Sequence, residues 1–369
     1  MMPAAPDPAP TRLEIDLDAV ASNWALLAGR HVAPVAAVVK ADGYGLGARP
    51  VAARLYRAGC RHFFVAQWPE AAELQGLVPG ALVAVLGGLE GRAPESLAGE
   101  SLAAEGAVPV LNTPGEIAAW SGLARRLGRK LPALLHVDTG MNRLGLGAGE
   151  LAALADDPTP LESFDLRYVM THLAAAEDPD DPATATQLAR FARARARLPP
   201  MPASIANSSA LFRAGTQSDL ARPGAALYGL NPTPAAPNPM RLVLRLSVRV
   251  LQVREIAAGE AVGYNGLWRA PAPSRIATVG TGYADGLPRA LSHHARAVFD
   301  GTPLPLVGRV SMDLMTFDAT SRPDLAPGDW LELIGPDNPP DTMAAAAGTI
   351  GYEILTGLGP RYSRVYLGA

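Results

Sequence analysis

The chain has 369 residues, of which 49% are apolar, enough to bury more than one hydrophobic core. Its 32 basic and 35 acidic residues give a net charge of -3 without a dense basic block, which argues against a nucleic-acid or membrane-surface footprint. The single cysteine, Cys60, excludes an intrachain disulfide and a cysteine metal cluster. The proline-rich start, residues 1–11, lacks the pattern of a secretory signal, and no apolar run reaches the ~20 residues that cross a bilayer. We therefore expect a soluble cytoplasmic protein without a metal site.

Short apolar runs alternate with amphipathic segments through residues 11–230, and this alternation predicts parallel strands joined by helices. Eight such units are typical of a closed (β/α)8 barrel, which we place at residues 11–235; an open doubly wound sheet is the alternative. The candidate strands are Val32–Val39, His62–Ala66, Ala81–Leu86, Ala107–Leu111, Pro132–Asp138, Leu166–His172, Pro202–Ser208 and Leu220–Gly229.

Helical patterns lie between these strands, for example at Asp18–Gly29. In a second helix Thr113 is the expected N-cap, Pro114 the first helical residue and Glu116 the partner that completes a capping box. The arginine-rich stretch Ala189–Leu198 has helical spacing, and we interpret it as a solvated helix face.

The pattern of apolar and polar residues changes after Pro232–Pro239, a stretch with four prolines that we interpret as a linker. Met240–Ile256 alternates apolar with basic residues, which is typical of a half-buried strand. Short strands and Gly/Pro turns follow, and the main helical signal lies near Met343–Ile350. Residues 240–369 are therefore predicted to form a smaller, mainly β domain.

Polar residues fall where the predicted barrel strands end. In a parallel barrel these ends share one rim, where active sites of this architecture are found. Taken alone, His172 is more typical of a structural hydrogen bond and Arg222 of an ion pair, but a convergence of six groups favours a functional site. The groups are Lys40, Asp138, Arg143, His172, the pair Asn207 and Ser208, and Arg222.

The chemistry of these residues indicates a cofactor. A lysine whose pKa is lowered by burial and nearby cations can form a Schiff base. Ser208 and the backbone N–H groups of Ser208–Ser209 and Arg222–Ala225 can bind a phosphate at the barrel mouth. A lysine adduct together with a phosphate site points to pyridoxal 5'-phosphate.

Several stretches, in order and over both predicted domains, resemble the signature segments of the alanine racemase family. They are AVVKADGYGLG (Ala37–Gly47), HVDTGMNRLG (His136–Gly145), THLA (Thr171–Ala174), ANSSA (Ala206–Ala210), RPGAALYGLNP (Arg222–Pro232), GTGYADGLPR (Gly280–Arg289) and GRVSMD (Gly308–Asp313). The resemblance implies a pyridoxal-phosphate barrel, a C-terminal β domain and a head-to-tail homodimer with shared active sites. It also implies D-alanine production for cell-wall synthesis.

The resemblance also assigns roles to residues. Lys40 matches the lysine that binds the cofactor covalently, and Tyr264 matches a catalytic base that reaches the site of the partner subunit. The matched cofactor positions are Lys40, Tyr44, Arg143, His172, Asn207, Ser208, Arg222 and Gly224; Arg143 and Met312 match substrate-carboxylate positions, and Glu177, Tyr283, Arg289 and Arg309 match entryway positions.

This sequence departs from the family pattern at two places. His136 stands where many members carry a lysine, often carbamylated, that anchors the arginine corresponding to Arg143. We expect no carbamate here. The alternative to a role beside Arg143 is that His136 is a strand residue that makes only a local hydrogen bond. Pro360 stands where many members place a tyrosine, and Tyr362 is a candidate substitute.

Racemisation needs a proton removed from one face of Cα and delivered to the other, which the pair Lys40 and Tyr264 would supply. Arg222 would face the pyridine nitrogen without protonating it, because a guanidinium holds its proton. Three alternatives remain open at this point: a racemase of broader specificity acting on serine, an amino-acid decarboxylase of the same fold, which should carry an acid in place of Arg222, and a non-enzymatic cofactor-binding barrel.

Overall fold

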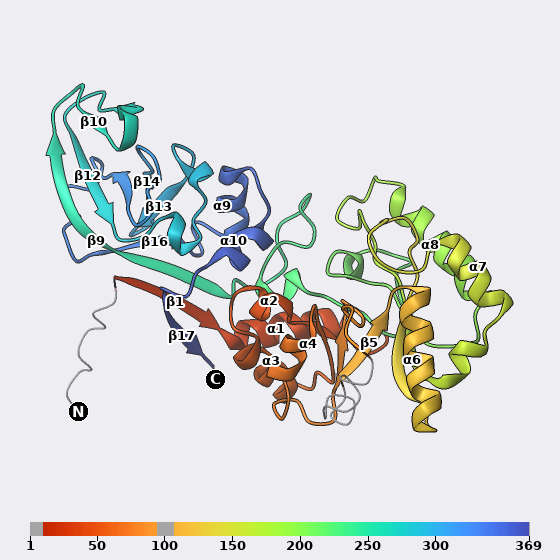
Figure 1. The fold of residues 1–369 in the computed structure, drawn as a ribbon. Helices are drawn as coiled ribbons and strands as arrows, with labels where there is room; N and C mark the ends of the chain where they lie inside the picture. Colours follow the sequence, from red (N-terminus) through yellow and green to blue (C-terminus); the bar gives the residue numbers. More distant parts are fainter. Residues whose placement is uncertain (1–9, 94–106, 369) are drawn as a thin grey trace. The chain divides into compact units, whose positions relative to one another are not determined.

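The computed structural model describes residues 10–93 and 107–368. The chain divides into two compact units (Figure 1). One unit comprises residues 20–241, and the other combines the first 19 residues with residues 242–369. No described helix is long and apolar enough to cross a membrane.

The first unit is a parallel barrel. Strands β2 to β8 pair in sequence order. The ring closes through Leu220 and Ala221, which bridge Ser204 of β8 on one side and Val35 on the other. Bonds from Leu220 N to Ala203 O (3.1 Å) and from Ala36 N to Ala221 O (2.8 Å) support this closure. The predicted eight-stranded barrel is confirmed, although its eighth strand is reduced to this bridge.

Helices flank the barrel strands (Figure 1). The elements are β2 (Ala37–Val38), α2 (Lys40–Tyr44), α3 (Ala48–Arg57), β3 (His62–Val65), α4 (Trp68–Glu73), β4 (Leu82–Val85), β5 (Ala107–Leu111), α6 (Pro114–Leu127), β6 (Leu131–His136), α7 (Ala148–Asp156), η1 (Thr159–Ser163), β7 (Phe164–Met170), α8 (Ala183–Arg195), β8 (Ala203–Ser204), η2 (Ala210–Phe212) and η3 (Ala225–Tyr228), preceded by α1 (Leu17–Ala28).

Helix α6 begins as predicted, with Thr113 Oγ1 accepting from Glu116 N at 3.1 Å and Pro114 as the first residue. The Glu116 carboxylate, however, accepts from Asn112 N (2.7 Å) and Leu89 N (2.8 Å). It therefore fastens the start of the helix to the loop after β4.

The second unit is built on an eight-stranded sheet with the order β14-β13-β16-β9-β1-β17, to which β12 and β15 add beside β9. The long strand β9 (Leu244–Ile256) buries Leu244, Leu246 and Val248 on one face, which confirms the alternation seen in the sequence. Strand β1 (Thr11–Asp16) pairs antiparallel with β9 and parallel with β17 (Ser363–Leu367). The start of the chain thus belongs to this sheet, whereas the sequence placed it with the barrel.

Most other elements of this unit are short, as predicted for a mainly β domain. They are β10 (Ala261–Val262), η4 (Tyr264–Gly266), β11 (Trp268–Arg269), β12 (Ser274–Val279), η5 (Tyr283–Asp285), η6 (Arg289–Leu291), β13 (Arg296–Phe299), β14 (Thr302–Pro305), β15 (Met315–Asp318), β16 (Trp330–Ile334), α9 (Pro340–Ala347) and α10 (Gly351–Gly357).

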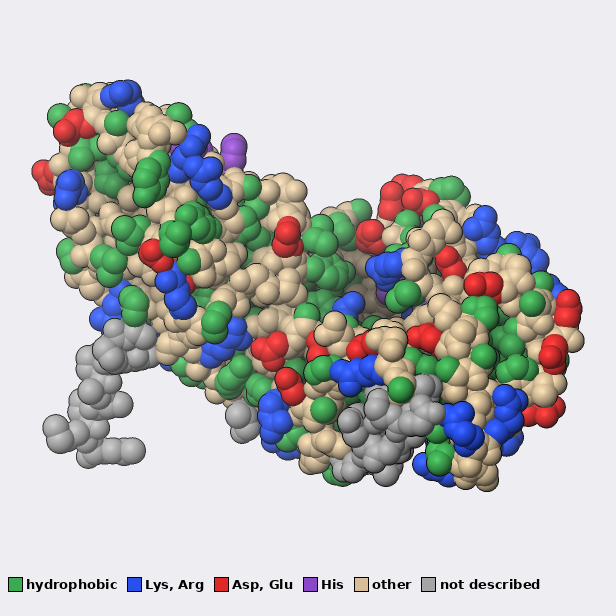
Figure 2. Space-filling view, viewed as in Figure 1, with side chains coloured by type: hydrophobic (Ala, Val, Ile, Leu, Met, Phe, Trp, Pro, Cys, Tyr) green, Lys and Arg blue, Asp and Glu red, His purple; other side chains and the backbone are tan. Residues whose placement is uncertain are grey.

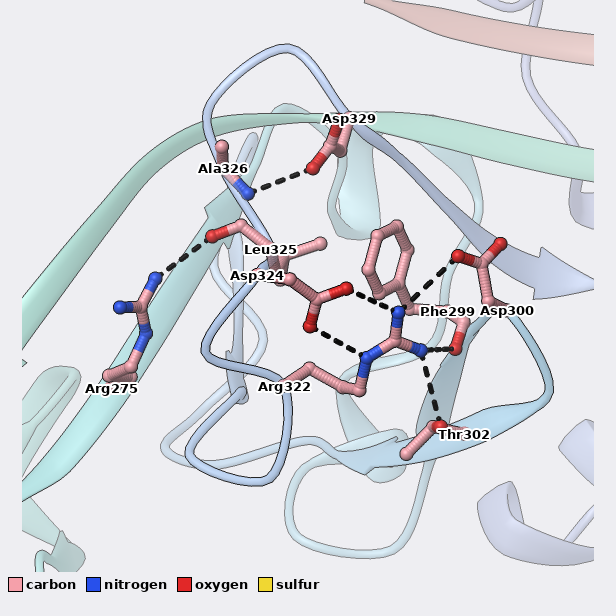
Figure 3. A network of polar contacts seen from close by, with 9 residues as sticks. All are labelled: Arg275, Phe299, Asp300, Thr302, Arg322, Asp324, Leu325, Ala326 and Asp329. Atoms are coloured by element: carbon pink, nitrogen blue, oxygen red, sulfur yellow. Dashed lines mark hydrogen bonds and ion pairs between the residues drawn. The ribbon is translucent and has the colours of Figure 1, made fainter.

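Arg322 fastens the loop after β15 to the β13–β14 hairpin (Figure 3). Its guanidinium forms a two-pronged contact with Asp324 (2.9 and 2.6 Å) and donates to Phe299 O at 2.7 Å. It also lies over the Phe299 ring, 4.2 Å from the centroid. Each bond serves the fold of this unit, so we regard the cluster as structural.

Candidate functional site

The rim formed by the carboxyl ends of the barrel strands gathers the polar residues that the sequence singled out. Lys40 follows β2, His172 follows β7, and Asn207 and Ser208 follow β8. Arg222 comes directly after the closing bridge. Figure 2 shows acidic and basic side chains interspersed over the visible face of the molecule, in line with a small-molecule site and not a charged docking surface.

Lys40 begins a turn whose next four residues have left-handed backbone conformations. Ala41, Asp42, Gly43 and Tyr44 all have φ between 51° and 61°, the left-handed region that L-residues seldom adopt in succession. Bonds from Gly43 N to Val39 O (2.9 Å) and from Ala41 N to Glu70 Oε1 (2.5 Å) hold the turn. Backbone strain of this kind concentrates at functional sites, where it fixes a side chain in place.

The Lys40 ammonium is half-buried, and its pKa is lowered first by burial and then by the charge of Arg143. Glu70 opposes this shift. A lower pKa increases the fraction of neutral amine at neutral pH, which is the form that attacks a carbonyl carbon.

Backbone N–H groups converge near Tyr44, in the turn that begins at Lys40, in an arrangement suited to a phosphate. Gly224 N and Ala226 N both donate to Ser208 Oγ, at 3.0 and 3.2 Å. A Cβ added to Gly224 would lie 2.1 Å from the Tyr44 hydroxyl, so only glycine leaves this space open. The Tyr44 ring is itself held by stacking on Tyr228, with ring centroids 4.6 Å apart. Two amides and two hydroxyls thus meet at one small cradle, as an anion requires.

Arg222 is buried and bonded only to neutral groups among the described residues. Its Nη1 donates to Ser204 Oγ (2.5 Å) and its Nη2 to Thr171 O (2.6 Å). Burial lowers the pKa of the guanidinium to about 10, which leaves it protonated at neutral pH. The ion-pair interpretation of Arg222 is therefore wrong, and its charge acts on the rim.

Two histidines of the rim are neutral. Burial, followed by the charges of Arg222 and Arg143, lowers the pKa of His172 to about 3. Burial and then Arg222 lower the pKa of His136 to about 4. Asn112 donates its Nδ2 to Leu86 O and Val110 O, so its Oδ1 accepts from His136 Nδ1, at 2.8 Å. His136 is therefore protonated on Nδ1, and Nε2 carries the lone pair.

Arg143 lies in a loop organised by Asp138. The Asp138 carboxylate accepts from Gly140 N (2.8 Å), Met141 N (2.9 Å) and Asn142 N (2.8 Å). Within the described parts of the chain, the Arg143 guanidinium makes no hydrogen bond, and it is exposed. Its charge nevertheless acts on Lys40 and His172, as their lowered pKa values indicate.

Residues of the second unit that the sequence assigned to the site occupy neighbouring loops. Tyr264 is 66% exposed, and Tyr283 and Met312 are also exposed. Tyr283 N donates to Ser311 O and Ala284 N to Met312 O, both at 3.0 Å, which joins two of these loops. A Cβ at Gly263 would lie 3.3 Å from Arg309 N, so the Tyr264 turn packs beside the Arg309 loop. Arg289 is exposed in this unit, and Glu177 in the barrel unit.

Tyr362 does not replace the tyrosine expected at Pro360. Its side chain is buried and its hydroxyl lies 3.1 Å from Thr281 Oγ1. Next to it, Arg361 forms a two-pronged pair with the buried Asp285 (2.6 and 2.8 Å) and reaches Asp313 at 2.8 Å. This clamp fixes the loops that carry Tyr283 and Met312.

Sequence reasoning missed several residues that hold the rim together. They are Glu70, Asn112, Thr139, Thr171 and Gln187, each of which bonds to a loop bearing a predicted site residue. A polar residue on the apolar face of a helix, as Gln187 is on α8, was an available signal.

Comparison with known proteins gives matches over nearly the whole chain. Residues 15–232 match the family "Alanine racemase, N-terminal domain" and residues 243–366 match "Alanine racemase, C-terminal domain". An alanine racemase of Acidiphilium cryptum is 56% identical over 354 residues, 96% of this chain and 98% of that protein. One of Rhodospirillum rubrum is 49% identical over 368 residues, 98% and 97% of the two chains. The crystal structure of the Bartonella henselae alanine racemase, with covalently bound pyridoxal phosphate, superposes with a TM-score of 0.93 at 42% identity, covering 98% of this chain and all of that one.

Proposed function

The chain belongs to the alanine racemase family, and on that premise we propose that it interconverts L- and D-alanine with pyridoxal 5'-phosphate held at the barrel mouth. The observation that carries the proposal is that the turn beginning at Lys40, a half-buried lysine of lowered pKa, also places the Tyr44 hydroxyl against the Ser208–Gly224 cradle. Both are properties of this chain's own residues.

The residues fit the cofactor in chemical type. Lys40 would bind it covalently, and the N–H groups of Gly224 and Ala226 with the hydroxyls of Ser208 and Tyr44 would hold its phosphate. When bound, the cofactor supplies an electron sink that makes the α-proton of an amino acid removable.

Arg222 would face the pyridine nitrogen as a permanent hydrogen-bond donor. Its neutral partners, Ser204 and Thr171, hold the guanidinium in place without taking its proton. A donor that keeps its proton leaves the ring nitrogen unprotonated and the electron sink weaker, which disfavours side reactions such as transamination. A decarboxylase would be expected to place an acid here, so Arg222 favours racemisation.

Two groups would move the proton. Lys40 would hold it on one face of Cα, and Tyr264 of a second copy on the other, as racemisation requires. Tyr264 is exposed in its own chain, as expected for a residue that acts in another subunit. Arg143, together with the backbone of Met312 from the second copy, would bind the substrate carboxylate. We place the homodimer in the cytoplasm, where D-alanine supplies cell-wall synthesis.

Chiral analysis tests the activity. The purified holoenzyme is incubated with L-alanine, and separately with L-serine, in heavy water. Deuterium at Cα together with the D-isomer supports racemisation, and the ratio of the two rates measures specificity. Release of carbon dioxide, or no exchange with either amino acid, overturns the proposal.

Mixing two inactive variants tests the shared sites. Lys40→Ala and Tyr264→Phe should each abolish racemisation, while Tyr352→Phe, an exposed tyrosine of the same unit, should not. In a symmetric dimer with shared sites, equal mixing after dissociation and reassociation restores about a quarter of the wild-type activity, because half the dimers are mixed and each has one intact site. Absence of any recovery in mixed dimers contradicts the exchange of Tyr264 between subunits.

A further inference from the structure

Helix α8 contributes a buried amide to the back of the rim. Gln187 is only 2% exposed, although the helix is otherwise rich in solvated arginines. Burying an amide is unfavourable unless its hydrogen bonds are made, so the partners of Gln187 indicate its role.

Every partner of the Gln187 side chain lies in a loop that carries a site residue. Its Nε2 donates to His172 O (2.9 Å) and to Thr139 Oγ1 (3.3 Å), and its Oε1 accepts from Ala174 N (2.8 Å). A carbonyl acceptor on one side and an N–H donor on the other fix the orientation of the amide. One side chain therefore joins the loop after β6, which bears Arg143, to the loop after β7.

The contacts continue to Arg222. Thr139 Oγ1 lies 2.7 Å from Thr171 Oγ1, and Thr171 O accepts from Arg222 Nη2 at 2.6 Å. Thr139 and Thr171 are both buried, so water does not compete for these bonds. Arg190, one turn along α8 from Gln187, donates to Thr139 O at 3.1 Å and so holds the same residue from its other side.

We propose that Gln187 is a positioning residue that, through Thr139 and Thr171, keeps the loops of Arg143 and His172 in register with Arg222. This inference rests on the proposed function of the site. Among the described residues, the side chains of Gln187 and Thr139 bond to neither the Lys40 turn nor Ser208 and Gly224, so the loss of either should misplace Arg143 and His172 while leaving the phosphate position intact. Misplacing groups at a reacting centre by a fraction of an ångström to 1 Å lowers rates strongly.

Gln187→Leu removes the three bonds at similar volume, and Thr139→Val against Thr139→Ser compares loss of the hydroxyl with its retention. Thr184→Val is the matched control, because Thr184 is a buried hydroxyl on the same helix whose bond, to Ala175 O at 3.2 Å, lies beyond the His172–Ala174 segment that Gln187 holds. We expect Gln187→Leu and Thr139→Val to lower kcat/KM for alanine by about ten- to a hundredfold. Thr139→Ser should recover most of this loss, and pyridoxal-phosphate affinity and the Thr184→Val kinetics should stay near wild type.

A second readout is independent of turnover. Six histidines allow the titration of His172 to be followed by NMR in each variant. Its pKa is low through burial and the charges of Arg222, Arg143, His136 and Lys40, so displacement of its loop in Gln187→Leu should raise the pKa toward the ordinary value. Thr184→Val should leave it unchanged. If the wild type fails to racemise alanine, the proposed function falls, and the His172 titration still decides the positioning role.

Unchanged kinetics and an unchanged His172 titration in Gln187→Leu and Thr139→Val overturn the proposal. So does a loss of the same size in Thr184→Val, which would show a general effect of weakening α8. If Gln187→Leu does not fold, the Thr139 pair alone decides between the outcomes.

Discussion

Replacing Gly224 by alanine tests the phosphate cradle most directly. The new Cβ would lie 2.1 Å from the Tyr44 hydroxyl oxygen and 2.9 Å from Cζ. Carbon and oxygen at rest stay about 3.5 Å apart, so the hydroxyl must retreat by more than about 1 Å. Tyr44 cannot turn aside freely, because its ring stacks on the fully buried Tyr228, whose hydroxyl donates to Val38 O at 3.1 Å.

Two costs follow from this clash. Overpacking a filled site lowers the free energy of unfolding by about 1–3 kcal/mol. Moving a hydroxyl away from a bound phosphate loses a charge-assisted hydrogen bond of about 1.5–3 kcal/mol, which corresponds to a Kd for pyridoxal phosphate raised about ten- to a hundredfold. Titration of apoenzyme with pyridoxal phosphate, followed by tryptophan fluorescence, measures the second cost, and urea unfolding measures the first.

Gly149→Ala is the matched control, since a Cβ there meets nothing within 4 Å and Gly149 lies in helix α7. It should raise the free energy of unfolding by about 0.5–1 kcal/mol and leave cofactor binding unchanged. In a Tyr44→Phe background, Gly224→Ala should cost less affinity than in the wild type, because the clashing oxygen is gone. Wild-type affinity in both Gly224→Ala and Tyr44→Phe would refute the cradle.

The remaining predictions concern pH and the second unit. The pKa values of His136 and His172 are lowered in the folded protein, so the unfolded chain binds more protons below about pH 6.5. The free energy of unfolding of the apoenzyme should therefore fall as the pH drops from 6.5 toward 4. The expected loss is up to about 1.4 kcal/mol per pH unit for each histidine. Urea unfolding across this range checks the slope, which His136→Gln should reduce; a flat profile contradicts the shifted values. Arg361→Gln should release Asp285 and loosen the Met312 loop, which should raise KM for alanine several-fold and leave cofactor affinity unchanged. Arg322→Gln, in the separate cluster with Asp324, should lower thermal stability alone. Equal KM values for the two variants would show that the Arg361 clamp has no effect on substrate binding.

Local patterns predicted the barrel and much of its rim, because strand ends in a parallel barrel are adjacent by construction. Lys40 could be placed at the site from its position after an apolar run, and Arg222 from its position within the eighth predicted strand. The pairing of Leu13 with Leu246 could not be predicted in this way, since it joins residues far apart in the sequence that have no local signal in common. For the same reason β1 was assigned to the barrel.

Other features were hidden because neutral or apolar surroundings give little pattern. The left-handed turn after Lys40 includes Ala41, whose intrinsic preference is for the right-handed helix, so tertiary contacts such as the one with Glu70 decide its conformation. The arginine-rich pattern of α8 indicates a solvated helix face and gives no sign of the buried Gln187. Gln187 lies four residues before the buried Phe191, and a polar residue at that spacing on an apolar face predicts a buried hydrogen-bond network.

The charges of the rim explain why its histidines and lysine belong together. Arg222 is held by a hydroxyl and a carbonyl oxygen, so its positive charge is not cancelled by a carboxylate partner within the described barrel unit. Burial and that charge lower the pKa of His136 and His172, and burial and Arg143 lower the pKa of Lys40, so the site holds neutral histidines and a lysine of lowered pKa in a positive field. A positive field favours anionic ligands, and both a phosphate and an amino-acid carboxylate are anions. An acid in place of Arg222 would replace a positive charge by a negative one, raise the pKa values of His136 and His172, and weaken the attraction of the site for both anions.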